Sequence, residues 1–530
     1  MGKSGMVEKT LRSVLACLMA VVLTVGLPPV IPREALAAED STVKQYFIGS
    51  HVMYALMDNG DCWAWGNSTH AEMGYAERNE YKPVRLLENI ASLPEGSGGS
   101  TTMVIDTSQD LWAWGRNDWG QVANGTASSS YNDFVTTPNK VMENVAKAYL
   151  FGNTCAAITT EGELWVWGLH VLGASDACAN PIKVMDDVNS FAASTNNNYF
   201  MAIKTDGSLW GWLSSGDKGE EYGMTSNPTK LLDDVAAVSL GMTHFAALKS
   251  NGDLYAWGNN YAGQVGDGTT EEKVEPVKVA ERIKGVSCGD GYTLAIRNDG
   301  VLLAWGLNGA GQLGDGTRIN RTTPIEILNQ VDSVQALNNR SAAVTSDGLL
   351  WMWGSDESGG TGANPASTFQ LEPAKVLDNV VADSIHSMYR SYLATYSAAV
   401  QNDGSLWFWG FNRNGYTGNG SESNAQRTPY RIKFESGNDH LLDLDINGDN
   451  GDRLDISTMT ALAAVEFADV CAKYPGSSVI PGLDEELAGN PSVWAAAAIS
   501  KYSDSPIWDD SDVTRSDLAV QELDGWNIVG

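Results

Sequence analysis

The chain has 530 residues, of which 43% are hydrophobic and 19% charged, and a formal net charge of −31. This length exceeds that of one ordinary domain, and the apolar content is sufficient for a large core. Such negative charge repels phosphate backbones and anionic membranes, so nucleic acid is excluded as a favoured partner.

The N-terminal segment has the features of a secretory signal peptide. Basic residues precede an apolar run over residues 14–27, and Ala35-Leu36-Ala37 supplies small residues for cleavage. The run is shorter than the roughly 18 apolar residues that a membrane-spanning helix needs. We therefore expect residues 1–37 to be removed near Ala37. The mature protein, with a net charge of −33 and no membrane span, is expected to be secreted or held at the cell surface.

A motif anchored on a tryptophan, which is followed by glycine in seven of eight copies, then recurs eight times between residues 38 and 434, at intervals of 45 to 56 residues, which is the size of a propeller blade. In six of the eight units a second tryptophan stands two positions earlier. Residues two apart face the same side of a strand, so we expect both tryptophans in one sheet interface. The anchoring tryptophans are Trp65, Trp114, Trp167, Trp212, Trp257, Trp305, Trp353 and Trp409.

Turn signals punctuate each unit. Dipeptides such as Asn251-Gly252 and Asp299-Gly300 follow an alternating apolar strand and are typical of two-residue hairpins. After the tryptophan, the pattern Trp-Gly-x-Asn-x-x-Gly, as in 257–263 and 305–311, places glycines where the chain leaves one strand for the next. The pattern predicts an all-β fold.

These motifs resemble those of the regulator of chromosome condensation repeat family, over roughly residues 43–434. The resemblance implies a β-propeller of four-stranded blades. Family members usually have seven blades, and the eight units here leave seven or eight blades open. The founding member is a nuclear exchange factor for a small GTPase and binds chromatin, a role not expected of an exported acidic protein. Exported bacterial propellers of this repeat, including a β-lactamase inhibitor protein, suggest binding through loops on one face.

The sequence marks out no catalytic residues. Its six histidines have no metal-ligand spacing. A structural role is predicted for His244, which lies beside a repeat strand, because polar residues near turns usually satisfy backbone groups. The alternative, a secreted enzyme that acts on carbohydrate or peptidoglycan through loop carboxylates, lacks a distinguishable carboxylate pair. Cys155 and Cys178 lie in one repeat, and whether they pair stays open. We predict a protein-binding propeller without enzymatic activity.

Four residues outside the repeat's core positions are the predicted partner contacts. They stand in the loops that follow Trp-Gly, and aromatic and arginine side chains dominate interface hot spots. Single exposed aromatics without a role are the competing interpretation. The four are Trp119, Tyr261, Arg413 and Tyr416.

Residues 435–530 are predicted to form a separate acidic module, with a linker at 435–439 and an amphipathic helix over 456–474. From residue 439 onward the chain carries 18 acidic and 4 basic residues. Asp-x-Asn-x-Asp is the front half of a calcium loop of the EF-hand type. A second acidic cluster precedes another predicted helix. The expected calcium ligands are Asp445, Asn447 and Asp449 in the first loop, and Asp510, Asp512 and Asp517 in the second.

The two loops together resemble a divergent dockerin, a calcium module that docks onto cohesin partners. The first loop is two residues longer than the pattern, which puts Thr458 where a bidentate acid belongs. The competing interpretation is an acidic helical tail that binds no metal.

Overall fold

The computed structural model describes residues 41–444, with gaps at 76–77, 129–132, 170–176, 195–198, 215–220, 364–367, 392–393, 436 and 443, and the residue pairs 522–523 and 526–527. The chain separates into two compact units, residues 1–444 and 445–530. The predicted signal peptide, the predicted helix over 456–474 and all six predicted calcium ligands lie outside the described residues. No described helix is both long and apolar enough to cross a membrane.

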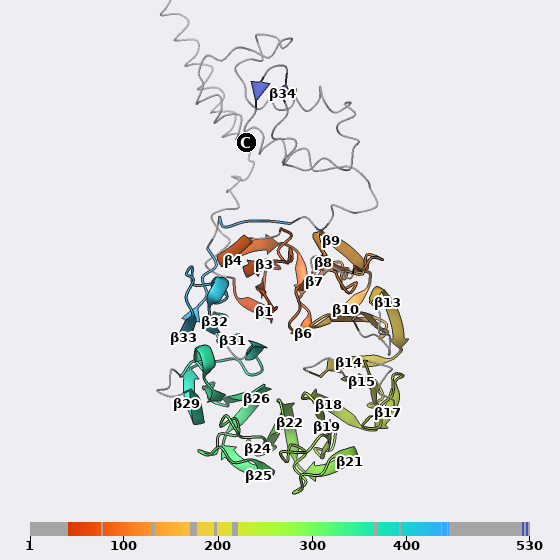
Figure 1. The fold of residues 1–530 in the computed structure, drawn as a ribbon, viewed down its shortest axis with the longest axis vertical. Coiled ribbons are helices and arrows are strands. Elements are labelled where there is room, and N and C mark those ends of the chain that lie inside the picture. The colour runs from red at the N-terminus through yellow and green to blue at the C-terminus, as the bar shows by residue number, and fades with distance from the viewer. Residues whose placement is uncertain are drawn as a thin grey trace, which may run out of the picture. The chain divides into compact units, whose positions relative to one another are not determined.

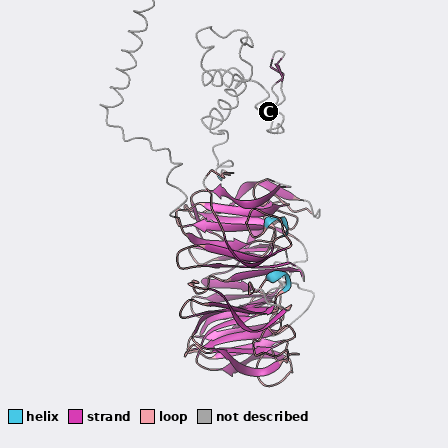
Figure 2. Ribbon diagram, turned by 90° about the vertical axis from the view of Figure 1, so that its left-hand side faces the viewer, coloured by secondary structure: helices cyan, strands magenta, loops and turns pink. Residues whose placement is uncertain are grey.

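The first unit is an all-β propeller of eight blades, so the open question of seven or eight blades is settled at eight (Figure 1). Each blade has four strands, which run antiparallel to their neighbours. In blade 3 a fifth strand, β6 (Glu95–Ser97), joins the sheet by pairing parallel with β10 (Val145–Phe151). The four strands of a blade follow one another from the centre of the ring outward, and Figure 2 shows the blades from the side.

The blades are built from consecutive stretches of the chain. Blades 1 to 4 comprise β1 (Val43–Ile48), β2 (Val52–Met57), β3 (Cys62–Ser68) and β4 (Arg78–Leu87); β5 (Ile90–Ser92), β7 (Thr101–Asp106), β8 (Leu111–Arg116) and β9 (Phe134–Met142); β10 (Val145–Phe151), β11 (Thr154–Thr159), β12 (Leu164–Gly168) and β13 (Cys178–Met185); and β14 (Val188–Ala193), β15 (Tyr199–Lys204), β16 (Leu209–Leu213) and β17 (Thr229–Leu232). Blades 5 to 8 comprise β18 (Val235–Leu240), β19 (His244–Lys249), β20 (Leu254–Gly258) and β21 (Lys273–Ala280); β22 (Ile283–Cys288), β23 (Tyr292–Arg297), β24 (Leu302–Gly306) and β25 (Arg321–Leu328); β26 (Val331–Leu337), β27 (Arg340–Thr345), β28 (Leu350–Ser355) and β29 (Phe369–Leu377); and β30 (His386–Ser391), β31 (Ala394–Val400), β32 (Leu406–Phe411) and β33 (Ala425–Arg431). Two 3-10 turns, η3 (Glu357–Gly359) and η4 (Arg413–Gly415), and the short strands β34 (Glu522–Leu523) and β35 (Trp526–Asn527) complete the described elements.

The anchoring tryptophans join each blade to the one before it. All eight are fully buried. In six blades the indole Nε1 donates to a backbone carbonyl of the preceding loop, at 2.9 to 3.1 Å, whereas the Nε1 of Trp257 in blade 5 is buried without a hydrogen-bond partner among the described residues. Each of these six indole rings is therefore held between two blades both by hydrophobic burial and by a hydrogen bond from its N–H. The pairs are Trp65 to Tyr416, Trp114 to Glu72, Trp167 to Gln121, Trp305 to Gln264, Trp353 to Gln312 and Trp409 to Gly360.

The ring closes between blades 8 and 1 with the same contacts that join the other blades. Trp65 Nε1 donates to the carbonyl of Tyr416 at 3.0 Å. Val43 N donates to the carbonyl of Gly404 at 3.1 Å, just as Ile90 N donates to Gly60 between blades 1 and 2. Because the seam repeats the ordinary interface, the eighth unit is a complete blade.

The second tryptophan of each pair is less buried than predicted. Trp63 and Trp112 are buried, whereas Trp165, Trp210, Trp351 and Trp407 are half-buried. These residues lie near the hairpin end of the blade, where the indole of Trp407 donates to Gln401 at 2.8 Å. Only the anchoring member of the pair is a fully buried core residue in every blade.

Residues 437–442 pack on blade 1, which corrects the prediction of a linker at 435–439. The backbone of Arg85 in β4 bonds with Asn438 and His440, and Leu442 N donates to Leu86. The Arg85 guanidinium contacts both carboxylate oxygens of Asp439, at 2.8 and 3.1 Å. This segment therefore covers the outer edge of blade 1, and the first unit extends to Leu444.

The cysteine pair that the sequence left open is not bridged. Cys155 and Cys178 are both free thiols, and so are Cys62 and Cys288 among the described residues. Cys155 is fully buried in β11, whereas Cys178 starts β13 and contacts the carbonyl of Asn180 at 3.1 Å.

Candidate functional site

One end of the ring carries the long loops of every blade. It is formed by the loops after each anchoring tryptophan together with the turns between the first two strands of each blade, which in blade 1 include residues 69–75 and 49–51. We call this end the loop face. The opposite end carries the short Asp-Gly and Asn-Gly hairpins. In blade 1 the close contact between the end of β3 and the turn at 49–51 requires a glycine. Gly66 has φ +116°, and a Cβ there would lie 2.3 Å from the carbonyl oxygen of His51.

The predicted contact residues all lie in loops of this face, but they differ in exposure. Tyr261 is 63% exposed, and Arg413 is also exposed. Trp119 is half-buried. Tyr416 is fully buried, packs its ring on Tyr396 at 5.6 Å and gives its carbonyl to Trp65, so its predicted role as a contact residue is corrected to a core role.

Further apolar side chains accompany Tyr261 on blades 5 and 6. Met242, in the turn between β18 and β19, is 42% exposed, and Ile319, in the loop between β24 and β25, is 62% exposed. Beside Ile319, the Arg318 guanidinium stacks over the ring of Phe369 at 4.5 Å. These loops present apolar and cationic groups on a rigid scaffold.

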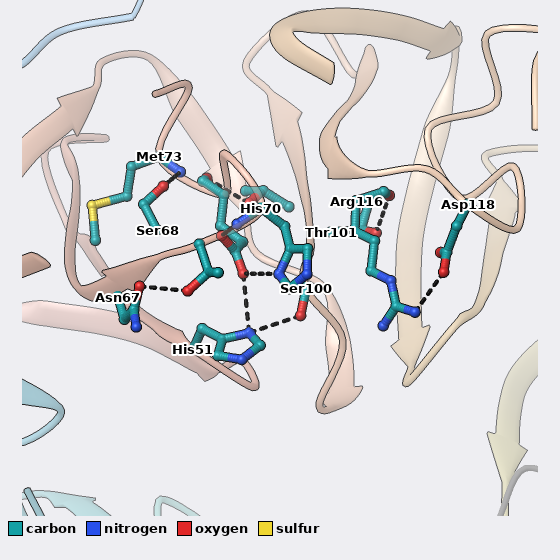
Figure 3. A network of polar contacts seen from close by, with 12 residues as sticks. His51, Asn67, Ser68, His70, Met73, Ser100, Thr101, Arg116 and Asp118 are labelled. Atoms are coloured by element: carbon teal, nitrogen blue, oxygen red, sulfur yellow. Dashed lines mark hydrogen bonds and ion pairs between the residues drawn. The ribbon is translucent and has the colours of Figure 1, made fainter. Parts of the chain in front are cut away.

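A different group of side chains is buried at the loop face of blade 1 (Figure 3). His51 comes from the turn between β1 and β2, and His70 and Glu72 come from the loop between β3 and β4. His51 Nδ1 lies 3.1 Å from Glu72 Oε1, and His70 Nδ1 lies 3.6 Å from the same oxygen. Ser100, from the matching turn of blade 2, places its Oγ 2.8 Å from His51 Nδ1. We call His51, His70, Glu72 and Ser100 the blade-1 cluster.

The backbone of Glu72 is held firmly. Its carbonyl oxygen accepts hydrogen bonds from Tyr54 at 3.0 Å, Thr102 at 2.7 Å and Trp114 at 2.9 Å. Its Oε2 accepts from the backbone N of His70 at 2.8 Å. One carboxylate oxygen therefore fixes the loop, while the other faces the two imidazoles.

The cluster favours an ionised carboxylate. Burial of Glu72 by itself would raise the pKa of this carboxyl, but its close contacts with the imidazoles of His51 and His70 outweigh that effect and leave the pKa below its ordinary value. The side chain is 3% exposed, so a negative charge is held here almost without water. In the part of the chain that the structure describes, this is the one group of three or more His, Cys, Asp or Glu side chains arranged to share an ion.

Sequence spacing alone gave no sign of the cluster. His51 and His70 lie 19 positions apart and match no ligand motif. A comparison among the repeats does provide a signal. The position of Glu72, seven residues after the anchoring tryptophan, is glutamine in blades 2, 5 and 6, namely Gln121, Gln264 and Gln312. A single acid in this register marks blade 1 as different.

The comparisons with known proteins agree with this architecture. A family model described as the RCC1-like domain matches residues 174–449, which is just over half of the chain. The chain belongs to the RCC1-like domain family. The match begins in blade 3 and continues past the last strand of blade 8.

Individual relatives of this RCC1-like chain are distant. It is 22% identical over 252 residues to the E3 ubiquitin-protein ligase HERC2 of Mus musculus, covering 43% of this chain and 5% of HERC2. It is 24% identical over 268 residues to the ultraviolet-B receptor UVR8 of Arabidopsis thaliana, covering 46% of this chain and 60% of UVR8. The match thus covers less than two thirds of either relative. Among solved structures, Prp20p of Saccharomyces cerevisiae, described with its binding to Gsp1p and histones, has a TM-score of 0.49 at 20% identity and covers 66% of this chain and 88% of that one.

Proposed function

We propose that this chain is an extracellular recognition protein that binds another protein through the loop face of its propeller and has no catalytic activity. The observation that carries the proposal is the exposed group on blades 5 and 6. Tyr261 is 63% exposed and Ile319 62% exposed, each at the tip of a loop anchored on buried strands. Such rigidly placed aromatic and aliphatic side chains contribute strongly to protein interfaces.

The net negative charge of the chain favours some classes of partner surface over others. The chain carries a formal net charge of −31, so association with a basic or neutral protein surface is favoured over association with a polyanion. The exposed Arg318 and Arg413 then supply the cationic groups that can contact carboxylates of the partner within an otherwise acidic surface.

The predicted signal peptide supports an extracellular setting. The ligase and receptor activities named for HERC2 and UVR8 belong to proteins that this chain matches over 5% and 60% of their length, and we do not extend those activities to it. The exposed loop residues of this chain support only protein recognition by loops on a rigid ring.

The proposal is tested by capture of partners from the cell-surface and secreted fractions of the native host. The mature protein serves as bait, beside Tyr261→Ala and Ile319→Ser. Val381→Ser is the matched control, because Val381 is 40% exposed and lies between β29 and β30 at the opposite end of the ring. A saturable partner that is lost with the loop-face variants and kept with the control supports the proposal. Binding that all three variants retain, or turnover of a cell-wall glycan by the pure protein, contradicts it.

A further inference from the structure

We propose that His51, His70 and Glu72 form a binding site for a divalent transition-metal ion, of which zinc is the representative. Two imidazole nitrogens and one carboxylate oxygen are a donor set typical of zinc sites with three protein ligands. Imidazole donors favour zinc, copper or nickel over calcium and magnesium, which prefer all-oxygen sites.

The donor atoms already lie at suitable separations. His51 Nδ1 and His70 Nδ1 are 3.1 and 3.6 Å from Glu72 Oε1, and all three donors fit within 4.8 Å of one another. Ligands at about 2.1 Å from a tetrahedral zinc ion are separated by about 3.4 Å. The two imidazole rings, with centroids 5.3 Å apart and planes tilted by 43°, are not stacked face to face and leave their Nδ1 atoms directed toward the carboxylate (Figure 3).

The surroundings hold these donors in place. The carbonyl of Glu72 accepts three hydrogen bonds, and the carbonyl of His51 accepts one from Asn67 N at 2.8 Å. Ser100 Oγ, 2.8 Å from His51 Nδ1, adds a neutral polar group beside the donors. Burial of all four side chains limits competition from water. A site that is already assembled loses little entropy when an ion binds.

The repeat itself does not require these residues. In blade 5, Gln264 Oε1 accepts from Ala262 N at 2.9 Å, the same bond that Glu72 Oε2 makes with His70 N. A glutamine would therefore satisfy the loop of blade 1 as well. The positions of His51 and His70 are held in blade 5 by Thr243 and Ala262. Blade 1 thus combines an anion and two imidazoles where the fold accepts neutral residues.

The other blades supply variants that test the site without damaging the fold. Glu72→Gln installs the glutamine of blades 2, 5 and 6, keeps the loop bond and removes the anionic donor. His70→Ala installs the alanine of blades 5 and 6. The matched control is His440→Ala, which removes a half-buried histidine of the first unit that contacts Glu80 at 3.9 Å, outside the cluster.

The experiment is a calorimetric titration of the full-length, untagged mature chain with Zn²⁺ after chelator treatment, together with Co²⁺ absorption spectra. We expect one tight Zn²⁺ equivalent, visible-range Co²⁺ bands of a tetrahedral or five-coordinate N/O site, and a higher Tm with zinc. Loss of an outer-shell partner typically weakens metal affinity about 10- to 100-fold, so loss of a ligand in Glu72→Gln or His70→Ala should weaken it by at least about 100-fold.

Three results would overturn the proposal. The first is the absence of a stoichiometric Zn²⁺ equivalent in the parent protein, which would make the blade-1 cluster a structural network of polar contacts. The second is undiminished binding in Glu72→Gln and His70→Ala, both folded by circular dichroism, which would place the ion elsewhere. The third is loss of binding in His440→Ala to the same degree as in the cluster variants. None of these results bears on partner capture by blades 5 and 6, so the metal-site proposal and the proposed binding function are tested independently.

Discussion

Individual tryptophans differ in what they contribute to this ring. The anchoring residue is fully buried between blades and in six blades donates to the preceding loop, whereas its neighbour two positions earlier is half-buried in blades 3, 4, 7 and 8. Trp353 and Trp351 in β28 represent the two types in one strand. The difference follows from position, since the earlier residue lies close to the hairpin end of the strand.

Trp353→Ala should lower the free energy of unfolding by about 3 to 5 kcal/mol, because it leaves a large cavity and removes one of the two donors to the Gln312 carbonyl, the other being Ser341 Oγ. Trp351→Ala, which removes a half-buried ring, should cost roughly half as much. Chemical denaturation followed by circular dichroism measures both losses. Equal losses for the two variants would refute the assignment of Trp353 to the inter-blade core.

His244 should make the propeller sensitive to mild acid. The side chain is completely buried in β19, and burial lowers its pKa to about 4, from an ordinary value of 6.5. The folded state therefore binds fewer protons than the unfolded state below pH 6.5, so the stability contributed by neutral His244 is present above that pH and is lost as the pH falls toward 4.

Between pH 7 and pH 5 this residue should account for a loss of roughly 2 kcal/mol. His244→Gln keeps a polar side chain of similar size near Thr293, whose Oγ1 lies 3.0 Å from His244 Nε2, and does not titrate. Denaturant unfolding at the two pH values, compared between parent and variant, isolates the effect from that of the carboxylates. An identical pH dependence in both proteins would contradict the prediction.

At the scale of elements, the outer edge of blade 1 receives an additional chain segment. Three backbone hydrogen bonds and a bidentate Arg85–Asp439 pair join residues 438–442 to β4. Leu442 packs against the hydrophobic core shared by blades 1 and 2 and lies over Gly74, where a Cβ would come within 2.6 Å of it. Covering an exposed strand edge in this way also reduces unwanted pairing with other chains.

A mature chain that ends at Phe434 should be less stable than one that ends at Leu444. Loss of three backbone hydrogen bonds at about 1 kcal/mol each predicts a deficit of roughly 3 kcal/mol, to which the solvent-exposed ion pair adds little. Thermal and urea unfolding of the two truncated chains measure the difference. Equal midpoints would show that the segment does not stabilise the ring.

Strands, turns and their repetition were predictable from the sequence, because period-two apolar patterns and Asn-Gly or Asp-Gly dipeptides report local backbone conformation. Tyr416 was misplaced because residues that follow the motif glycine look like loop residues in the sequence. In the structure, the residue seven positions after the anchoring tryptophan is buried in these blades. These residues are Gln121, Gln264, Gln312 and Tyr416. The blade-1 cluster and the segment at 437–442 depend on contacts between distant segments, which periodicity does not encode.

For the whole molecule, closure of the ring uses the same interface eight times. The bond from a backbone N at or before the first strand of each blade to the β2–β3-type hairpin of the preceding blade recurs from Ile90–Gly60 through Val380–Gly348 and then joins Val43 to Gly404. No described blade borrows a strand from the opposite terminus. The eight blades of the ring therefore lie within residues 43–431, and residues 445–530 form a second unit whose role can be tested independently.

That second unit carries the expected calcium ligands, and calcium binding by it remains a prediction. Asp445, Asn447 and Asp449 offer alternating oxygen donors in the sequence, and residues 445–530 contain 16 acidic and 4 basic residues. A bound cation would offset the mutual repulsion of these acidic residues, so the full chain should take up calcium and gain stability, whereas a chain that ends at Leu444 should do neither.

Asp445→Ala in the full chain should remove most of the calcium uptake, while Glu72→Gln should leave it unchanged, which separates this site from the blade-1 cluster. Calorimetric titration with calcium up to about millimolar concentration, the range of extracellular calcium modules, measures it. Absence of uptake by the full chain would reduce the second unit to an acidic tail and would end the expectation of a cohesin-like partner.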